Sequence, residues 1–361
     1  MRLLAVVPSV YDRNPSQRYR IEQWEPLLRE RGVEITYQPF EDAELNAVLY
    51  RPGHLGEKAR LVGQAMLRRM RGLGDAGRFD AAYVLREAAL LGPPVFEWLL
   101  ARRGLPFVFD FDDAVFERYV SPSNGYLSYL KFPGKTRTIC RLAAHVTAGN
   151  EYLADYARRV NPRVTVIPTT VDTARYTVEP RPPNEVLVIG WTGSYSTVQH
   201  LDTLQPALRR LAREERFRLR VIGAPGYKVE GLDVEALTWR SETEVEDLRP
   251  LDVGVMPLPD DRWSRGKCGM KALQYMGLGV ATVCSPVGVN SSIIRDGENG
   301  MLAATEDEWV GKLRRLLRDA PLRERLGREG RRTVEETYSA AVQAPRVYEI
   351  LKSIAKRRPR A

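Results

Sequence analysis

Two lysines in the second half of the chain, Lys267 and Lys271, have the type and spacing of a phosphate site. They lie in the segment Trp263–Met276, where most other side chains are apolar. If a helix begins near Lys267, then Lys267, Lys271 and Gln274 share one face, and the rest of the helix is buried. A buried ammonium without a partner costs several kcal/mol. A diphosphate at the helix N-terminus would satisfy both charges, which favours this interpretation over lysines that reach solvent.

A second candidate for phosphate binding is the loop Gly190–Thr197, which follows an apolar run and precedes an amphipathic stretch. Gly193 allows close approach of the backbone, and Ser194, Ser196 or Thr197 can cap the helix that follows. The hydroxyl and N–H groups of such a loop can bind a phosphate. Ordinary helix capping explains the same residues equally well, so both interpretations stay open at this point.

Three carboxylates, those of Asp110, Asp112 and Asp113, lie at the end of the apolar run Phe107–Phe111. Their mutual repulsion requires a cation or a proton nearby. Asp112 or Asp113 could orient or deprotonate an acceptor hydroxyl, and the set could bind a divalent metal as an Asp-x-Asp motif. Capping of the following turn is a third interpretation.

The segment Asn14–Arg20 carries two arginines, Arg18 and Arg20, that could bind an anionic acceptor or a phosphate. Ordinary surface arginines are an equally good interpretation. Three histidines occur in the chain, at His54, His145 and His200. They do not cluster, which gives little support to a histidine metal site or a Ser-His-Asp triad.

Short β-branched or aromatic runs alternate with amphipathic stretches, a pattern typical of parallel sheets built from βαβ units. The first expected series of strands is Leu3–Val7, Glu34–Tyr37, Ala81–Leu85, Phe107–Phe111, His145–Ala148 and Val164–Ile167, with a helix over Arg20–Arg31. The second is Val186–Ile189, Leu219–Ile222, Ala236–Trp239, Val253–Met256 and Ala281–Cys284. Ligands bind beyond the carboxyl ends of such strands, where the segments described above lie.

The pattern lapses between Thr173 and Asn184, where three prolines can continue neither a helix nor a central strand. A chain of 361 residues is long enough for two cores. We therefore expect an α/β protein of two Rossmann-like domains, each a parallel sheet flanked by helices, with a cleft between them. The expected domains are residues 1–175 and 184–335, with a helical segment, 336–361, packing back on the first domain.

The composition is that of a folded protein, with 43% hydrophobic and 28% charged residues. A net charge of +9 indicates attraction to anions; we expect phosphates, no nucleic acid, and peripheral contact with a membrane surface at most. The amphipathic stretch Pro94–Arg103 keeps that contact open. The three cysteines form no CxxC pair, and no apolar run is long enough for a secretory signal or a membrane span. These features predict a cytoplasmic protein.

The chain resembles bacterial glycosyltransferases of family 4, the group-1 type, which have the GT-B fold. The likeness lies in Gly266–Met276, Ser285–Asn290, Asp296–Gly300, Pro106–Phe116, His145–Tyr152 and Val164–Asp172. The resemblance implies a retaining hexosyltransferase that moves a sugar from a nucleoside diphosphate sugar to a hydroxyl of a glycan, glycolipid or small molecule, as in the synthesis of cell-envelope polysaccharides. It implies no metal and no other cofactor.

The sequence departs from this family at its two-glutamate motif, which falls on Gly266 and Gln274. Gln274 can still hydrogen-bond a ribose hydroxyl. Asp112 stands where the family often has a histidine. The arginine and lysine that usually hold the diphosphate are absent around Trp191–His200, and the two lysines described first would take over that charge.

These observations assign a role to each candidate residue. The expected donor-binding residues are Gly193, Ser194, Tyr195, Ser196, Thr197, Trp239, Arg240, Gly266, Lys267, Cys268, Lys271 and Gln274. The expected catalytic residues are Asp112, Asp113 and Lys267, and Arg18 and Arg20 are expected to bind the acceptor. A nucleotide-sugar epimerase of GT-B-like fold and a non-catalytic nucleotide-sugar binding protein remain alternatives, the second because the glutamates are missing.

Overall fold

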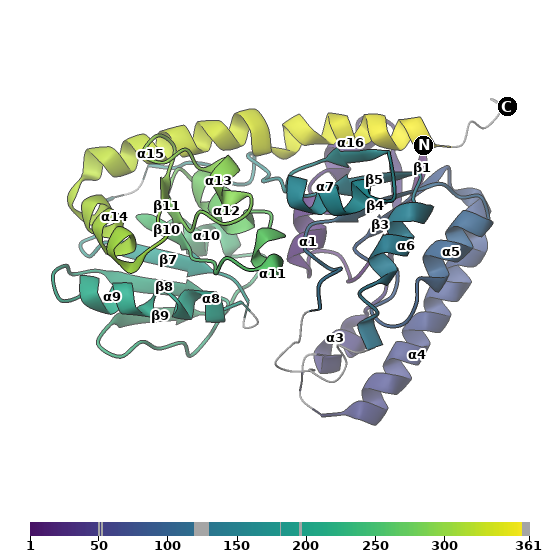
Figure 1. Ribbon diagram of the computed structural model, residues 1–361, viewed down its shortest axis with the longest axis horizontal. Coiled ribbons are helices and arrows are strands. Elements are labelled where there is room, and N and C mark those ends of the chain that lie inside the picture. Colours follow the sequence, from purple (N-terminus) through teal and green to yellow (C-terminus); the bar gives the residue numbers. More distant parts are fainter. Residues whose placement is uncertain (50, 52, 119–129, 181, 195–196, 356–361) are drawn as a thin grey trace. The chain divides into compact units, whose positions relative to one another are not determined.

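The computed structural model describes residues 1–49, 51, 53–118, 130–180, 182–194 and 197–355 (Figure 1). The chain divides into two compact units, residues 1–169 with 343 onward and residues 170–342. Residues 170–175, which the sequence assigns to the first domain, thus fall in the second unit. Of the expected C-terminal segment, residues 336–342 also fall in the second unit.

The first unit contains one six-stranded parallel sheet in the order β2-β1-β3-β4-β5-β6. Its strands are β1 (Arg2–Val7), β2 (Glu34–Pro39), β3 (Ala81–Leu85), β4 (Phe107–Phe111), β5 (His145–Ala148) and β6 (Val164–Val166). The central strands β3 and β4 are buried along their whole length, as expected for a sheet covered by helices on both faces. The first series of strands predicted from the sequence is confirmed.

The helices of the first unit are α1 (Pro15–Gln17), α2 (Glu25–Arg29), α3 (Ala43–Leu49), α4 (Leu55–Gly72), α5 (Val95–Arg102), α6 (Lys135–Leu142), α7 (Glu151–Arg158) and most of α16 (Ala340–Ile354). A π-helical turn, η1 (Arg18–Glu22), lies between α1 and α2, and a 3-10 turn, η2 (Leu73–Arg78), follows α4. The single helix expected over residues 20–31 is therefore wrong, because η1 and α2 are separate elements. Arg346 of α16 donates to the Val166 carbonyl of β6 over 3.2 Å.

The second unit contains a second six-stranded parallel sheet, in the order β12-β11-β10-β7-β8-β9. Its strands are β7 (Val188–Thr192), β8 (Arg218–Ile222), β9 (Asp233–Leu237), β10 (Val253–Met256), β11 (Ala281–Cys284) and β12 (Met301–Leu302). β9 begins three residues before the predicted strand, because its pairing register with β8 starts at Asp233. The two-residue strand β12 was not predicted.

The helices of the second unit are α8 (Gln199–Asp202), α9 (Gln205–Leu211), α10 (Glu244–Leu248), α11 (Arg262–Arg265), α12 (Met270–Gly277), α13 (Asn290–Ile293), α14 (Glu306–Arg318) and α15 (Ala320–Thr333), followed by the π-helical turn η4 (Val334–Tyr338). Apolar side chains of α9 and α14 pack with those of the central strands in one buried core. Two Rossmann-like units are thus present, as predicted. Within the described residues, no helix is both long and apolar enough to span a membrane.

Candidate functional site

The sheet order of the second unit brings the two predicted phosphate-binding segments to the carboxyl ends of two neighbouring strands, β7 and β10. β8 and β9 lie on one side of β7, whereas β10, β11 and β12 lie on the other. The connections that leave β7 and β10 therefore run in opposite directions from neighbouring strand ends, which is where open α/β sheets bind ligands. The loop at Gly193 follows β7, and the connection after β10 leads to Lys267 and α12.

Lys271 lies in the first turn of α12, and its Nζ is 5.4 Å from the ring centre of Trp191 at the end of β7. The Nζ of Lys267 is 5.0 Å from the ring centre of Trp263 in α11. Both lysines are half-buried. Cations at these distances are attracted by the negative face of an aromatic ring, so both ammonium groups are held by aromatic side chains of the same unit.

The prediction that Lys267 and Lys271 share one helix face is wrong. The helix starts only at Met270, because Gly269 adopts a left-handed conformation with φ of 71°. A Cβ on Gly269 would lie 2.3 Å from the Cδ1 of Ile293, so the chain can turn there only without a side chain. Lys267 instead belongs to the connection between α11 and α12.

Two further predicted donor residues, Gly266 and Cys268, also lie in this connection. Both are buried, and the Cys268 thiol donates to the Gly266 carbonyl over 3.7 Å. They shape the turn that carries Lys267.

The loop after β7 is folded tightly against the sheet. Gly193 donates to the Ile222 carbonyl of β8 over 2.9 Å, and a Cβ on Gly193 would lie 2.3 Å from the Trp191 ring. The Ser194 N–H donates to the Thr197 hydroxyl over 3.0 Å. Glycine is therefore required at position 193 by packing, and the loop lies directly beside the ring that holds Lys271. The predicted residues Tyr195 and Ser196 lie outside the described residues.

His200, in the short helix α8 after this loop, was missed as a site residue. Its side chain is buried, and its backbone N–H donates to the Thr197 carbonyl over 3.1 Å. Burial, followed by the charges of Lys271 and Lys267, lowers the pKa of His200 to about 4, and Asp261 opposes this shift. Both lysines thus act on one imidazole. The position of His200 in the first turn after the glycine loop was the signal available in the sequence.

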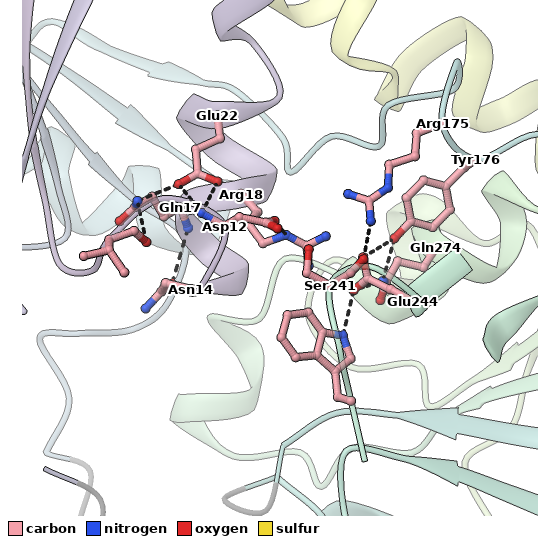
Figure 2. Close-up of polar contacts among 12 residues, drawn as sticks. Asp12, Asn14, Gln17, Arg18, Glu22, Arg175, Tyr176, Ser241, Glu244 and Gln274 are labelled. Carbon is pink, nitrogen blue, oxygen red and sulfur yellow. Dashed lines mark hydrogen bonds and ion pairs between the residues drawn. The ribbon is translucent and has the colours of Figure 1, made fainter. Parts of the chain in front are cut away.

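Gln274 lies in a buried polar cluster around Glu244, the first residue of α10 (Figure 2). The Gln274 Nε2 donates to the Tyr176 hydroxyl over 3.0 Å and to the Glu244 Oε1 over 3.2 Å. The Tyr176 hydroxyl donates to the Glu244 Oε2 over 2.9 Å. Glu244 therefore provides a carboxylate next to position 274, from a segment that the sequence gave no reason to connect with it.

The same carboxylate positions Trp239, which lies just beyond β9. The Trp239 Nε1 donates to the Glu244 Oε1 over 3.0 Å, and the neighbouring Arg240 is exposed. Arg175 donates to the Ser241 carbonyl in the same loop. The loop after β9 is thus held at Trp239 by Glu244 and at Ser241 by Arg175.

In the first unit, Arg20 is not available to bind an acceptor, and that prediction is wrong. Its side chain is wholly buried, with Nε 2.8 Å from the Asp110 Oδ2, a second contact from the guanidinium to the Asp110 Oδ1, and Nη1 2.5 Å from the Ile167 carbonyl. Thr147 also donates to Asp110, over 2.5 Å. The cause is η1, whose residues are all buried, so that Arg20 faces the sheet.

Arg86 provides the cation that Asp112 and Asp113 require, and the sequence did not indicate it. Its Nε donates to the Asp112 Oδ1 over 2.7 Å and its Nη2 to the Asp113 Oδ2 over 2.5 Å. Arg86 has a φ of 61°, an uncommon conformation for a residue with a side chain. Burial alone would raise the pKa of Asp112, but the charge and hydrogen bond of Arg86 outweigh it and lower that pKa. Asp112 is therefore a persistent carboxylate and a weak base.

Arg18 lies in a second polar network of the first unit (Figure 2). Its Nε is 2.7 Å from the Asp12 Oδ1. The Asp12 N–H and the Gln17 Nε2 both donate to Glu22, the latter over 2.6 Å. Burial raises the pKa of Glu22 to about 7. Arg18 thus has a carboxylate partner, Asp12, six residues before it in the chain. Its role in acceptor binding stays a prediction.

The metal interpretation of the carboxylates finds no geometric support. Among the residues that the structure describes, no group of three or more His, Cys, Asp or Glu side chains is arranged to hold a metal ion. Asp110, Asp112 and Asp113 are instead paired with arginines.

Comparison with known proteins finds a family profile that matches part of the second unit. Residues 186–319 match the profile of the family described as glycosyl transferases group 1. This segment, just over a third of the chain, is therefore similar to group 1 glycosyltransferases. A D-inositol 3-phosphate glycosyltransferase from Stackebrandtia nassauensis is 28% identical over 218 residues, which cover 51% of this chain and 48% of that protein. The chain therefore matches about half the length of this curated relative.

Solved structures show that the fold of this chain is GT-B-like. A sucrose-phosphate synthase from Thermosynechococcus elongatus is similar with a TM-score of 0.71 and 14% identity, over 98% of this chain and 99% of that one. HepE from Anabaena, in complex with UDP and glucose, is similar with a TM-score of 0.66 and 15% identity, over 98% of this chain and 100% of that one.

Proposed function

We propose that this protein is a glycosyltransferase that takes a hexose from a nucleoside diphosphate sugar and passes it to an acceptor hydroxyl with retention of configuration. The observation that carries the proposal is that the connections carrying Gly193, Lys267 and Lys271 leave the neighbouring ends of β7 and β10, where the sheet order reverses. The Lys271 Nζ lies 5.4 Å from the ring centre of Trp191 at the end of β7. These strand ends lie in the segment that matches the family.

A uridine diphosphate hexose is the donor class that we favour. HepE, a protein of the same fold, is known in complex with UDP and glucose and with UDP-glucose. In this chain the base would lie by Trp239 and Arg240, where Glu244 already holds the indole in place. The diphosphate would lie between the two lysines and the loop at Gly193.

The lysines would provide the main catalytic effect, because cations held in place stabilise the negative charge that develops on the leaving diphosphate. Gly266 has no side chain with which to contact the donor sugar. Asp112, whose lowered pKa makes it a weak base, would orient the acceptor hydroxyl by accepting a hydrogen bond. No metal and no other cofactor is part of this scheme.

Alanine substitution of Lys267 and of Lys271 tests the proposal. Each variant should lose about 10²–10³-fold in kcat for UDP-hexose hydrolysis and transfer, the loss typical of removing one donor to a developing oxyanion. Lys352→Ala, at an exposed position in the first unit, is the matched control. Unchanged turnover in both site variants, with thermal melts like those of the control, would refute the assignment.

Two alternatives are a nucleotide-sugar epimerase, which can share the two-domain architecture and the donor site, and a binding protein without catalysis, which the absence of carboxylates at Gly266 and Gln274 and the net positive charge suggest. An epimerase would convert the donor sugar with no acceptor present, which product analysis detects. A binding protein would bind the donor but release no sugar with any acceptor. The transferase proposal requires sugar release that rises when an acceptor hydroxyl is supplied.

The acceptor is a glycan, glycolipid or small molecule, and the surface of α5 favours a glycolipid at the cytoplasmic face of a membrane. Trp98 is 47% exposed and Val95 44% exposed, and Arg102 lies 5.1 Å from the Trp98 ring centre. Exposed apolar side chains beside a basic group suit an anionic lipid surface.

Sedimentation with vesicles tests this contact. The protein should bind vesicles that contain phosphatidylglycerol and bind neutral phosphatidylcholine vesicles weakly, and Trp98→Ala should reduce binding several-fold. Val342→Ala, at another exposed apolar position, is the control. Equal binding of the Trp98 variant and the wild type would contradict the contact.

A further inference from the structure

The sheet of the first unit has a switch point of its own, between β1 and β3. β2 lies on one side of β1, whereas β4, β5 and β6 lie beyond β3. The connections that leave β1 and β3 therefore run in opposite directions from neighbouring strand ends, which is where open α/β sheets bind ligands. The connection after β1 contains α1, and the connection after β3 begins with Arg86. These two strand ends are thus the place in the first unit where a ligand is expected.

Arg86 has a strained backbone at this point. Its φ is 61°, and the Glu87 N–H donates to the Leu85 carbonyl over 2.7 Å, which closes a three-residue turn around Arg86. Such turns are rare and strained for a residue with a side chain, and glycine would fit them at lower cost. Strain of this kind is typical of residues whose side chains have a function.

The Arg86 guanidinium joins the connections that follow β1, β3 and β4. It donates to Asp112 over 2.7 Å and to Asp113 over 2.5 Å, and both of these residues follow β4. It also donates to the hydroxyl of Ser16, which lies in α1 after β1. One side chain therefore ties the two sides of the switch point together and fixes the Asp112 carboxylate there.

The Arg86 cluster is accessible, unlike the ion pair formed by Arg20 and Asp110 in the same unit. The side chains of Arg86, Asp112 and Asp113 are 25%, 10% and 14% exposed, whereas those of Arg20 and Asp110 are wholly buried. A ligand at the switch point can therefore contact the first cluster but cannot reach the second.

We propose that Arg86 is the positioning residue of the acceptor site: it fixes the Asp112 carboxylate at the switch point of the first sheet, where that carboxylate accepts a hydrogen bond from the acceptor hydroxyl. This inference rests on the transferase activity proposed above. A carboxylate held by one guanidinium, which is itself held by Asp113 and Ser16, keeps the hydroxyl oxygen aligned for the reaction. Arg86 acts through Asp112 and does not itself contact the acceptor.

The release of UDP from UDP-glucose, in which water can take the place of the acceptor, tests this role. Arg86→Gln removes the cation, whereas Arg86→Lys keeps it but replaces the planar guanidinium with an ammonium that does not bridge two carboxylates in the same way. Each variant should lose about 10²-fold in kcat, the loss typical of a misplaced reacting group. The KM for UDP-glucose should stay unchanged, because the proposed donor site belongs to the second unit.

Arg158 provides the matched control. It also lies between two carboxylates of the first unit, those of Glu151 and Asp155, but on the exposed surface of α7. Arg158→Gln and Arg158→Lys should keep the kcat and the KM of the wild type. Thermal melts show whether all four variants are folded, and Arg86→Lys remains the test if Arg86→Gln does not fold.

The pH profile of kcat separates a positioning role from a purely structural one. The groups that face Asp112 are Arg86, Arg20, Tyr83, the Ser16 hydroxyl and the neighbouring Asp113. Burial raises the pKa of Asp112, and the charge of Arg86 is the largest influence that lowers it. In Arg86→Gln the pKa of Asp112 should therefore rise, and kcat relative to the wild type should fall as the pH falls from about 7 to 5. Arg86→Lys keeps the charge, so its ratio to the wild type should stay constant.

A double variant completes the test. If Arg86 acts through Asp112, then Arg86→Gln combined with Asp112→Asn should have about the kcat of Asp112→Asn alone. Losses that multiply, or an unchanged kcat in both Arg86 variants, would overturn the role of Arg86 and leave the donor proposal intact. A wild type that releases no UDP from UDP-glucose would overturn the proposed donor class, and this inference with it.

Discussion

The two units place their charged side chains in opposite ways. In the first unit, Arg20 and Arg86 are paired directly with carboxylates at 2.5–2.8 Å. In the second unit, Lys267 and Lys271 lie over aromatic rings, and burial, followed by their charges, lowers the pKa of His200. Internal ion pairs neutralise the first cluster, whereas the ammonium groups of the second lie close to aromatic rings. The contrast is between arginines held by carboxylates and lysines held by aromatic side chains.

The largest expected effect comes from breaking the buried pair of the first unit. Arg20→Met leaves the Asp110 carboxylate buried without its cation, and this should lower the free energy of unfolding by about 3–5 kcal/mol. Urea denaturation measures the change. Arg29→Met, which removes an exposed pair with Glu25, should change it by less than about 1 kcal/mol. Equal losses in the two variants would show that the buried Arg20 pair contributes no more to the free energy of unfolding than the exposed Arg29 pair.

An intermediate effect is expected at Asp112. Asp112→Asn weakens its charge-assisted bond with Arg86 and should lower the free energy of unfolding by about 1–3 kcal/mol. Because the pKa of Asp112 is lowered below its ordinary 3.8, this contribution is complete above about pH 4 and is lost only as the pH falls through the folded value.

Urea denaturation of wild type and Asp112→Asn between about pH 7 and pH 3 tests that pH dependence. The difference between the two proteins should stay constant down to about pH 4 and then narrow. A difference that narrows between pH 7 and pH 5 would indicate a raised pKa, and would favour Asp112 as the base that deprotonates the acceptor.

The smallest effect is expected at His200 without ligand. Its folded pKa of about 4 lies below the ordinary 6.5, so between these values the unfolded chain binds a proton that the folded protein does not. The free energy of unfolding should therefore fall as the pH falls from 6.5 to 4, and His200→Gln should show a shallower decline. Equal slopes in urea denaturation would contradict the electrostatic contrast between the two units.

The sequence alone determined most of the strands and their order along the chain. Alternation of apolar runs with amphipathic stretches predicted both parallel sheets, and turn residues such as Gly193 indicated where a loop follows a strand. Lys267 and Lys271 were predicted from their apolar surroundings. The prediction of the two sheets succeeds because secondary structure and burial leave periodic patterns that extend over only a few neighbouring residues. The phosphate-binding role of the two lysines stays a prediction.

Only the tertiary structure decided which side chains meet. Arg86 contacts Asp112 because β3 and β4 are neighbours in the sheet, and Arg20 reaches Asp110 because η1 is buried against that sheet. Glu244 joins Gln274 through the packing of α10 and α12. Such contacts depend on strand order and on helix placement, which are set by packing of the whole unit and leave no local pattern in the chain.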